Sequence, residues 1–472
     1  MVRAGVLAIA MVAAWAAMAA AQEPPPTPGA AEPTESAEPS PNPHAGGLAD
    51  RDVLTGDWGG LRSTLEDHGL RLGAIETSEV LGNPTGGVRR GAIYEGRLEM
   101  DFDLDLEKSV GWTGATLHAN AYQIHGRGLS ANDLGNNILT ASNIEAARTT
   151  RLFDLWLQQQ LLDDMVSVRV GQLAADDEFF TSLYGANFVN STFGWPAILA
   201  SNLPSGGPAY PLAAPGLRIK VSPTDQWSFQ TAVFDGDPAG PGSGNPQLRD
   251  ASGTAFRLDD HPFVISELAY AINQQKDAAG LPGTYKLGAW YHDGSFADQR
   301  FDSSGLSLAN PASSGVAATH RGDYGFYALL DQMVWREPEA ADQGLGIFLR
   351  LAGNPADRNL VDFYGDGGVT YKGLLPDRPD DVIGLGVAYA NISDAARSLD
   401  KDSAAFGMSR PVRDFEAAIE LTYSAQIMPW WTLQPDLQYI FHPTGGGAPA
   451  SAPQGPAIGD ALVLGLRTTV KF

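Results

Sequence analysis

Charged and aromatic side chains recur at every second position in several short segments. Arg97, Glu99 and Asp101 are separated by single apolar residues, and Asp154 and Trp156 follow the same spacing. A guanidinium group supplies planar hydrogen-bond donors and a carboxylate supplies acceptors. Opposed rows of such groups can exchange hydration water for solute hydroxyl groups at a small net change in free energy. We therefore expect a surface that binds hydroxyl-rich solutes weakly.

Two further arginines also lie between apolar residues, and we add them to the candidate solute-binding residues. Arg169 lies between two valines, and Arg218 lies between Leu217 and Ile219. We expect any one of these charged groups either to contact solute or to be simply solvated, and the sequence leaves both interpretations open.

The segment from about Leu173 to Gly207 combines acidic and aromatic residues. It contains Asp176, Asp177, Glu178, Phe179, Phe180, Phe193, Trp195 and Pro196. Asp176 and Glu178 join the candidate binding residues, and Trp195 is our first candidate for stacking on the apolar face of a solute ring. The alternative is that the aromatic residues anchor the segment, which we favour for Phe179, Phe180 and Phe193.

Motifs for other chemistry are missing. The eight histidines form no HExxH motif, and the pair His118 and His125 has no convincing third ligand. No GxSxG elbow, phosphate-binding glycine loop or dinucleotide fingerprint occurs. The loop that begins at Asp235 lacks EF-hand spacing and is predicted to be a turn. We expect no catalytic residue, metal or cofactor.

The candidate residues need strands to position them. Between Tyr94 and Leu106 the apolar positions alternate with acidic and basic ones, which places one face in an apolar medium and the other in water. The apolar set is Tyr94, Leu98, Met100, Phe102, Leu104 and Leu106. A soluble sandwich would also alternate, but it would turn its leucines inward and rarely sustain so many strands with such long loops.

The same alternation recurs in residues 166–170, 217–221, 345–351 and 415–423. We count about sixteen such segments, separated by Gly, Pro, Asn and Asp clusters. An even number of strands fits a transmembrane antiparallel β-barrel with an aqueous lumen. Aromatic residues near the predicted strand ends are expected to form interfacial girdles. They are Tyr94, Trp112, Phe153, Tyr324, Phe326, Trp430 and Trp431.

The first residues predict export. Arg3 precedes an apolar run from Val6 to Ala20, and small residues lie just before Gln22. This pattern is typical of a cleaved signal peptide over residues 1–21, although a retained anchor is the alternative. Residues 22–47 are rich in Pro and Glu and predict a disordered linker, or else a segment that binds a partner or the cell wall.

Residues 48–472 form the predicted barrel domain, which begins with a short periplasmic helix at about 57–68. Asp57 can cap this helix and Gly69 suits its left-handed end. At the other end of the chain, "ALVLGLRTTVKF" alternates up to Phe472, which is typical of the signal read by the outer-membrane assembly machinery.

The amino-acid composition excludes several classes of protein. The net charge of −24 disfavours nucleic acid as a partner, and the absence of cysteine excludes disulfides and thiolate chemistry. After the first residues no apolar run of about eighteen residues occurs, so we expect no helical membrane span. The mean hydropathy of −0.14 remains compatible with a barrel, because alternating strands average to a bland value.

The chain resembles the carbohydrate-selective porins of the OprB family over roughly residues 53–472. The motifs that carry the resemblance are "LTGDWGGLRSTLEDHGL", "GQLAADDEFF", "NFVNSTFGWP", "LQPDLQYIFHPTGG" and "ALVLGLRTTVKF". The resemblance implies a sixteen-stranded outer-membrane pore that admits glucose and related saccharides. It also implies that the loop after the fifth strand folds inward and narrows the lumen.

The leading hypothesis is therefore passive, sugar-preferring diffusion of monosaccharides and small oligosaccharides into the periplasm. A second hypothesis is a general porin or one that prefers organic acids, and a third is an outer-membrane hydrolase with a triad on the barrel rim. The expected partners are small carbohydrate solutes, outer-membrane lipid and the assembly machinery. Assembly into a homotrimer is plausible from the broad porin class.

Overall fold

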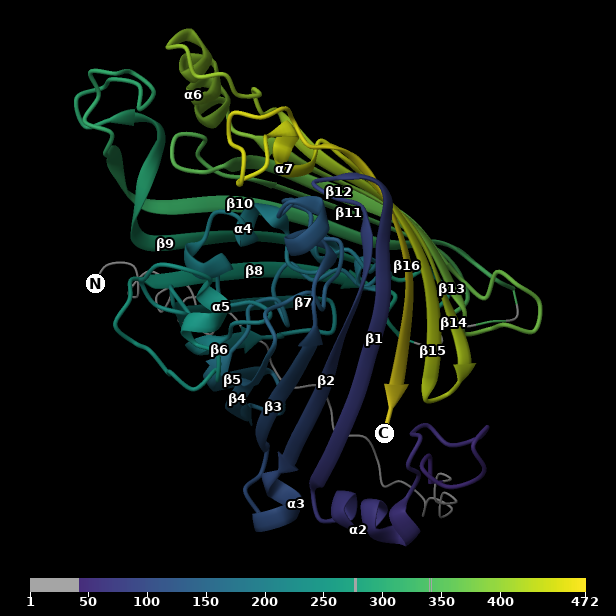
Figure 1. Cartoon of the computed structure of the whole chain (residues 1–472). Helices are drawn as coiled ribbons and strands as arrows, with labels where there is room; N and C mark the ends of the chain where they lie inside the picture. The colour runs from purple at the N-terminus through teal and green to yellow at the C-terminus, as the bar shows by residue number, and fades with distance from the viewer. Residues whose placement is uncertain (1–41, 276–277, 339, 341) are drawn as a thin grey trace. The chain divides into compact units, whose positions relative to one another are not determined.

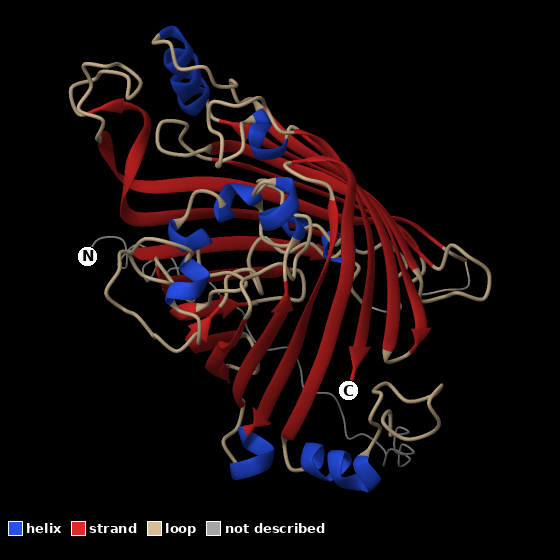
Figure 2. Ribbon diagram, in the orientation of Figure 1, coloured by secondary structure: helices blue, strands red, loops and turns tan. Residues whose placement is uncertain are grey.

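The computed structural model describes residues 42–275, 278–338, 340 and 342–472. The expected signal peptide at 1–21 and most of the expected linker lie outside these residues. Strands dominate the described chain (Figures 1 and 2). They are β1 Leu70–Gly87, β2 Gly91–Asp105, β3 Ala115–Gly126, β4 Thr149–Leu161, β5 Val166–Leu173, β6 Ala214–Val221, β7 Trp227–Asp235, β8 Pro262–Ile272, β9 Gly283–Asp302, β10 Ala317–Arg336, β11 Gly344–Gly353, β12 Val361–Lys372, β13 Val382–Ile392, β14 Phe415–Met428, β15 Trp431–Phe441 and β16 Gly459–Lys471.

These strands form a closed antiparallel barrel of 16 strands, as the alternation predicted. Each strand pairs with the next along the chain, and β1 closes the barrel against β16, with Ile75 opposite Lys471. Closure pairs the backbone groups of every strand edge, which a strand in lipid requires. Among the described residues, no helix is both long enough and apolar enough to cross a membrane.

Side chains alternate between the lumen and the outer surface. On β2, Ile93 and Glu95 are buried inside, whereas Tyr94 and Met100 are exposed outside. The predicted strand was one residue too long, because Leu106 begins a helix instead. The Asp105 carboxylate accepts hydrogen bonds from the Glu107 and Lys108 amides and so caps that helix.

The helices lie in the connections between strands, apart from α2, which precedes β1. They are α2 Leu61–Asp67, α3 Leu106–Val110, α4 Ala197–Ala200, α5 Pro246–Arg249, α6 Asp394–Ala405 and α7 Pro443–Gly446. The predicted short N-terminal helix is present as α2, and the Asp57 carboxylate accepts from the Ser63 amide. Helices α2 and α3 lie at the barrel end with short turns, which is the periplasmic end in proteins of this architecture (Figure 1).

Most of the aromatic residues expected in the girdles are exposed. Trp112 is exposed in the turn before β3, and Trp430 stacks on Trp431 where β15 begins. Tyr324 and Phe326 are exposed like Tyr94 but lie in the middle of β10 rather than near its end. The expectation was wrong for Phe153.

Phe153 is 2% exposed and packs against Tyr122 and Tyr210 inside the barrel. Its strand contains a register shift, because Ala119 pairs with Leu155 while Ala121 pairs with Leu152. This irregularity inserts an extra residue into β4, so that Phe153 and Asp154 are both buried. A strict period of two cannot predict this arrangement.

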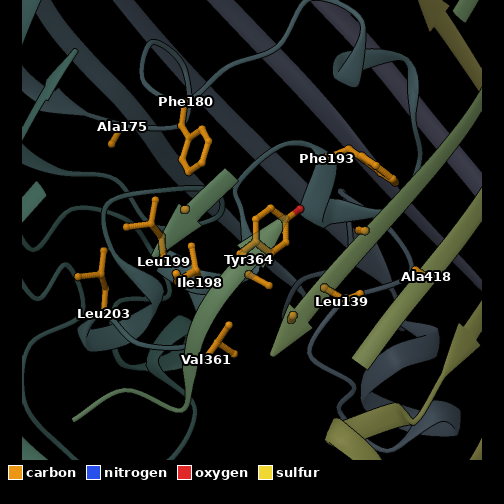
Figure 3. Close-up of a cluster of buried hydrophobic side chains, with 14 of the residues drawn as sticks. Leu139, Ala175, Phe180, Phe193, Ile198, Leu199, Leu203, Val361, Tyr364 and Ala418 are labelled. Carbon is orange, nitrogen blue, oxygen red and sulfur yellow. The ribbon is translucent and has the colours of Figure 1, made fainter. Parts of the chain in front are cut away.

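An apolar cluster fills part of the barrel (Figure 3). Phe180, Ile198, Leu199 and Leu203 of the β5–β6 connection pack with Tyr364 of β12. The connection therefore has its own core, which it shares with the inner face of the barrel wall.

We expect Phe180→Ala to lower the free energy of unfolding by about 3–5 kcal/mol, because it would leave a cavity beneath a fully buried ring. Phe180 stacks on Tyr327 with ring centroids 4.1 Å apart. Urea unfolding of the lipid-reconstituted protein measures the change. Phe326→Ala is the matched control, because Phe326 precedes Tyr327 in β10 but is 65% exposed. An equal loss in both variants would contradict this packing.

Candidate pore constriction

A polar strip runs along the lumenal face of β2 to β6. On β2, Arg97 donates to Glu99 with 3.0 Å between Nη2 and Oε2. The Asn120 amide of β3 donates to Asp101 at 2.6 Å and to Glu99 at 3.2 Å. The structure thus brings together the three predicted residues of β2 and adds Asn120.

Trp156 lies in the middle of this strip. Its ring stacks on His118 of β3 with a centroid separation of 4.6 Å, and the Arg169 guanidinium of β5 lies 3.7 Å from the ring centroid. Cation–π contact and stacking fix the ring between its neighbours. Trp156 therefore orients Arg169, while its own faces are largely occupied.

Glu178 of the β5–β6 connection joins two predicted arginines. It forms ion pairs with Arg169 at 2.8 Å and with Arg218 of β6 at 2.9 Å. These three residues line a cavity of about 310 Å³ together with Gln158 and Lys220. The cavity lies at the lower end of the range of about 300–1,000 Å³ found for small-molecule sites.

Arg97 also contacts two tyrosines that the sequence analysis missed. Its guanidinium carbon lies 4.7 Å from the Tyr122 ring centroid and 5.1 Å from that of Tyr210. Tyr122 follows His118 and Asn120 at alternate positions of β3, so the alternation rule could have found all three. Tyr210 lies in an irregular segment, where no periodic signal exists.

The remaining predicted residues divide into two groups. Asp154 hydrogen-bonds with Asp177, and Asp176 accepts from the Tyr210 amide at 2.9 Å, so both belong to the strip. Trp195 does not, because its indole donates to the Gly206 carbonyl and its ring packs against the apolar cluster. This position favours anchoring over solute stacking for Trp195.

The β5–β6 connection folds into the lumen, as expected, and the barrel wall binds its backbone. Glu267 accepts from the Phe180 amide at 3.0 Å, and Asp331 accepts from the Leu183 amide at 3.0 Å. Glu420 accepts from the Val189 amide at 2.6 Å. Wall carboxylates thus act as acceptors for a segment that has no strand partner of its own.

Arg350 of β11 supplies the complementary donors. It is fully buried, forms an ion pair with Asp366, and donates to the carbonyl groups of Phe180 and Gly194 at 2.9 Å each. It also donates to the Thr192 carbonyl at 2.8 Å. One side chain therefore holds two parts of the connection against the wall.

A second connection, between β3 and β4, also packs inside and was not predicted. Leu129, Leu134 and Leu139 are fully buried, and Glu416 of β14 accepts from the Leu139 amide at 2.7 Å. Isolated leucines without periodicity carry no signal for where a loop folds. The lumen is therefore narrowed by two segments rather than one.

Burial, together with the neighbouring charge of Asp177, raises the pKa of Asp176 to about 7. Asp176 is thus neutral at lower pH and gains its negative charge as the pH rises through about 7. Because the folded-state pKa lies above the ordinary value of 3.8, the contribution of this carboxyl to stability is present at low pH and is lost as the pH rises from about 4 to about 7.

We expect the preference of the pore for cations to increase between pH 6 and pH 8, and Asp176→Asn to remove most of this increase. Reversal potentials in a salt gradient across a planar bilayer measure the preference. Asp225→Asn, in the exposed β6–β7 turn, is the control. An undiminished increase in Asp176→Asn would contradict the assignment to Asp176.

Comparison with known proteins identifies this architecture. A profile of the family described as "Carbohydrate-selective porin, OprB family" matches residues 89–472. The chain belongs to this porin family. It is similar to Porin B of Pseudomonas aeruginosa, with 27% identity over 441 residues that cover 89% of this chain and 91% of that protein.

The high-pH structure of Pseudomonas putida OprB superposes with a TM-score of 0.79 at 25% identity, covering 90% of this chain and 99% of that chain. This OprB-family member is thus an outer-membrane β-barrel and a sugar porin. The hydrolase hypothesis is set aside, because the family comprises channels rather than enzymes.

Proposed function

We propose that this porin passes monosaccharides and small oligosaccharides by passive diffusion along the strip on β2 to β6. The observation that supports the proposal is the interleaving of guanidinium groups, carboxylates and aromatic rings on one side of the lumen. The arginines and carboxylates match the hydroxyl groups at a sugar's edge. The half-buried ring of Tyr210 offers an apolar surface for its C–H faces, whereas Tyr122 is buried and packs against Tyr210 and Phe153.

Binding along this route is weak, which suits a channel. Each hydrogen bond exchanged with water contributes about 0.5–1.5 kcal/mol. A few such bonds give a dissociation constant on the order of millimolar. Tighter binding would slow release and reduce flux.

The charge of the strip argues against a preference for organic acids. Acidic residues outnumber the four cationic ones, which are Arg97, Arg169, Arg218 and Lys220. The acidic residues are Glu99, Asp101, Asp154, Asp176, Asp177 and Glu178, together with Asp103 of β2, which lies 2.7 Å from His118. They remain in excess with one proton shared between Asp154 and Asp177 and with Asp176 partly neutral at pH 7. Such an excess attracts cations and repels carboxylate solutes.

We therefore expect a modest preference for potassium over chloride. Reversal potentials in a tenfold KCl gradient at pH 7 test the expectation. The potential should decline as salt is raised, because salt screens the strip. Anion selectivity would contradict the charge assignment and would favour the organic-acid alternative.

The size and identity of the permeating sugars can be tested in proteoliposomes. Swelling rates are compared for glucose, maltose and maltotriose against neutral solutes of matched size that lack a sugar ring. We expect sugars to pass faster and to block ion current partly at millimolar concentration. If sugars neither pass faster nor block current, the preference fails, although the channel itself remains.

Two further predictions concern membrane insertion and assembly of the barrel. Alternation along β16 up to Phe472 supports recognition by the assembly machinery, and deletion of Phe472 should reduce insertion. Homotrimer formation remains a prediction from the broad porin class. Crosslinking in native membranes distinguishes a trimer from a monomer.

A further inference from the structure

The extracellular ends of β1 to β4 gather arginines in a chain that is otherwise strongly acidic. Arg127 directly follows β3, Arg148 directly precedes β4, and Arg89 and Arg90 form the β1–β2 hairpin turn. The whole chain has 55 acidic and only 31 basic residues. Four exposed arginines at one end of four neighbouring strands are therefore a local reversal of the overall charge.

Most of these arginines have no carboxylate partner that would neutralise their charge. Within the described chain, no side-chain hydrogen bond or ion pair is formed by Arg90, Arg127 or Arg148, and only Arg89 pairs, with Asp133 at 2.6 Å. Glu145, which lines a cavity with Arg127 and Arg148, accepts from the amides of Ser130 and Ala131. A net positive surface therefore remains.

Arg127 and Arg148 line two cavities together with Asn132. One cavity, of about 480 Å³, also contains Ala92 and Tyr94. Ala92 and Tyr94 point away from the lumen, because Ile93 and Glu95 between and beside them are buried inside. The second cavity, of about 460 Å³, extends over the β3–β4 connection. The arginines thus lie at the extracellular rim, where the first cavity borders the outward-facing Ala92 and Tyr94 and the second opens over the inward-folded β3–β4 connection.

A hydrogen-bonded polar group continues this surface down the outer wall. The Tyr94 hydroxyl lies 3.0 Å from His125 Nε2 and 3.1 Å from Ser78 Oγ. Ser78 donates to Glu76 at 2.7 Å, and His125 Nδ1 lies 3.0 Å from Gln123. Acyl chains cannot form hydrogen bonds with these polar groups. Sugar hydroxyl groups can.

The backbone that bears the arginines is held in place. The Arg127 amide donates to the Tyr94 carbonyl, and the amides of Val88 and Arg89 donate to the Asp133 carbonyl. The Ala147 amide donates to Gln247. Fixed backbone limits the entropy lost when the side chains bind a ligand.

We propose that this rim, formed by Arg127, Arg148, Asn132 and Tyr94, binds the phosphorylated headgroup of an outer-leaflet glycolipid. Guanidinium forks match phosphate oxygens in pairs, and the position beside an outward-facing aromatic residue corresponds to headgroup depth. Asn132 and the group around Tyr94 contact the sugar hydroxyls. This site is independent of the lumenal strip.

The test uses the full barrel purified in detergent and measures lipid binding by native mass spectrometry. The probes are bisphosphorylated lipid A, its dephosphorylated form and inorganic phosphate. We expect R127A/R148A to bind bisphosphorylated lipid A about thirtyfold more weakly, because each arginine near an anionic headgroup contributes about 1 kcal/mol. The double variant R321A/K401A removes the same charge from exposed extracellular positions and should bind like the wild type.

Both arginines are exposed and unpaired, so folding should persist, and heat-modifiable migration on gels confirms it. Unchanged binding in R127A/R148A overturns the proposal. Equal binding of the dephosphorylated form overturns the phosphate contact. Complete displacement of lipid A by millimolar inorganic phosphate would reassign the rim to soluble anions. A stable oligomer that excludes lipid and dissociates in R127A/R148A would reassign it to a second copy of the chain.

Discussion

Arg350→Met is expected to release the β5–β6 connection from the wall, with a loss of about 3–5 kcal/mol in stability and a larger, noisier conductance. The loss is large because Asp366 would remain buried without its cationic partner. The carbonyl groups of Phe180 and Gly194 would also lose their donor, and that of Thr192 would keep only the Tyr364 hydroxyl. Methionine keeps most of the volume, so the effect reports on charge and hydrogen bonding rather than on a cavity.

Single-channel recording and urea unfolding measure the two consequences. Arg321→Met is the matched control, because Arg321 is 75% exposed and its removal should change neither quantity appreciably. Arg350→Met combined with Asp366→Asn should recover part of the stability, since it removes the unpaired charge. A single-variant channel with unchanged conductance and noise would show that Arg350 does not position the connection.

Arg169→Ala is expected to weaken sugar block of the ion current about tenfold, which corresponds to one charge-assisted hydrogen bond of about 1.5 kcal/mol. The Arg169 guanidinium offers several hydrogen-bond donors in a fixed position. It stacks on the Trp156 ring and forms an ion pair with Glu178. Half-blocking concentrations of glucose and maltose measure the change.

Lys220→Ala is the matched control, because Lys220 lines the same cavity and carries the same charge. We expect it to shift ion selectivity in the same direction while leaving sugar block largely unchanged. Equal loss of block in both variants would mean that net charge, rather than the guanidinium group, governs binding. Full block in Arg169→Ala would remove Arg169 from the sugar route.

The barrel could be predicted from the sequence because its signal is local. Alternation along residues 94–104 reports directly which side chains meet lipid and which meet water. The same rule failed at Phe153, where an irregular β4 places two consecutive side chains inside. A single inserted residue changes the facing of its neighbours without altering composition.

The candidate constriction could be predicted only in part. Alternation identified lumenal residues such as Arg97 and Arg169, but it cannot tell which lumenal residues meet a loop. Glu420 and Arg350 share the lumenal pattern of Glu99, yet they bind the backbone of the β5–β6 connection. Contacts between residues far apart in the sequence decide that difference. Tyr210 was missed because it lies in an irregular segment without a periodic signal.

The central claim is that sugars pass along the strip on β2 to β6. A crystal structure of the protein soaked with maltose tests it most directly. We predict sugar density inside the barrel, within hydrogen-bonding distance of Arg169 or Arg218 and against the ring of Tyr210. Density confined to the opposite wall of the lumen, away from these three residues, would contradict the proposed route.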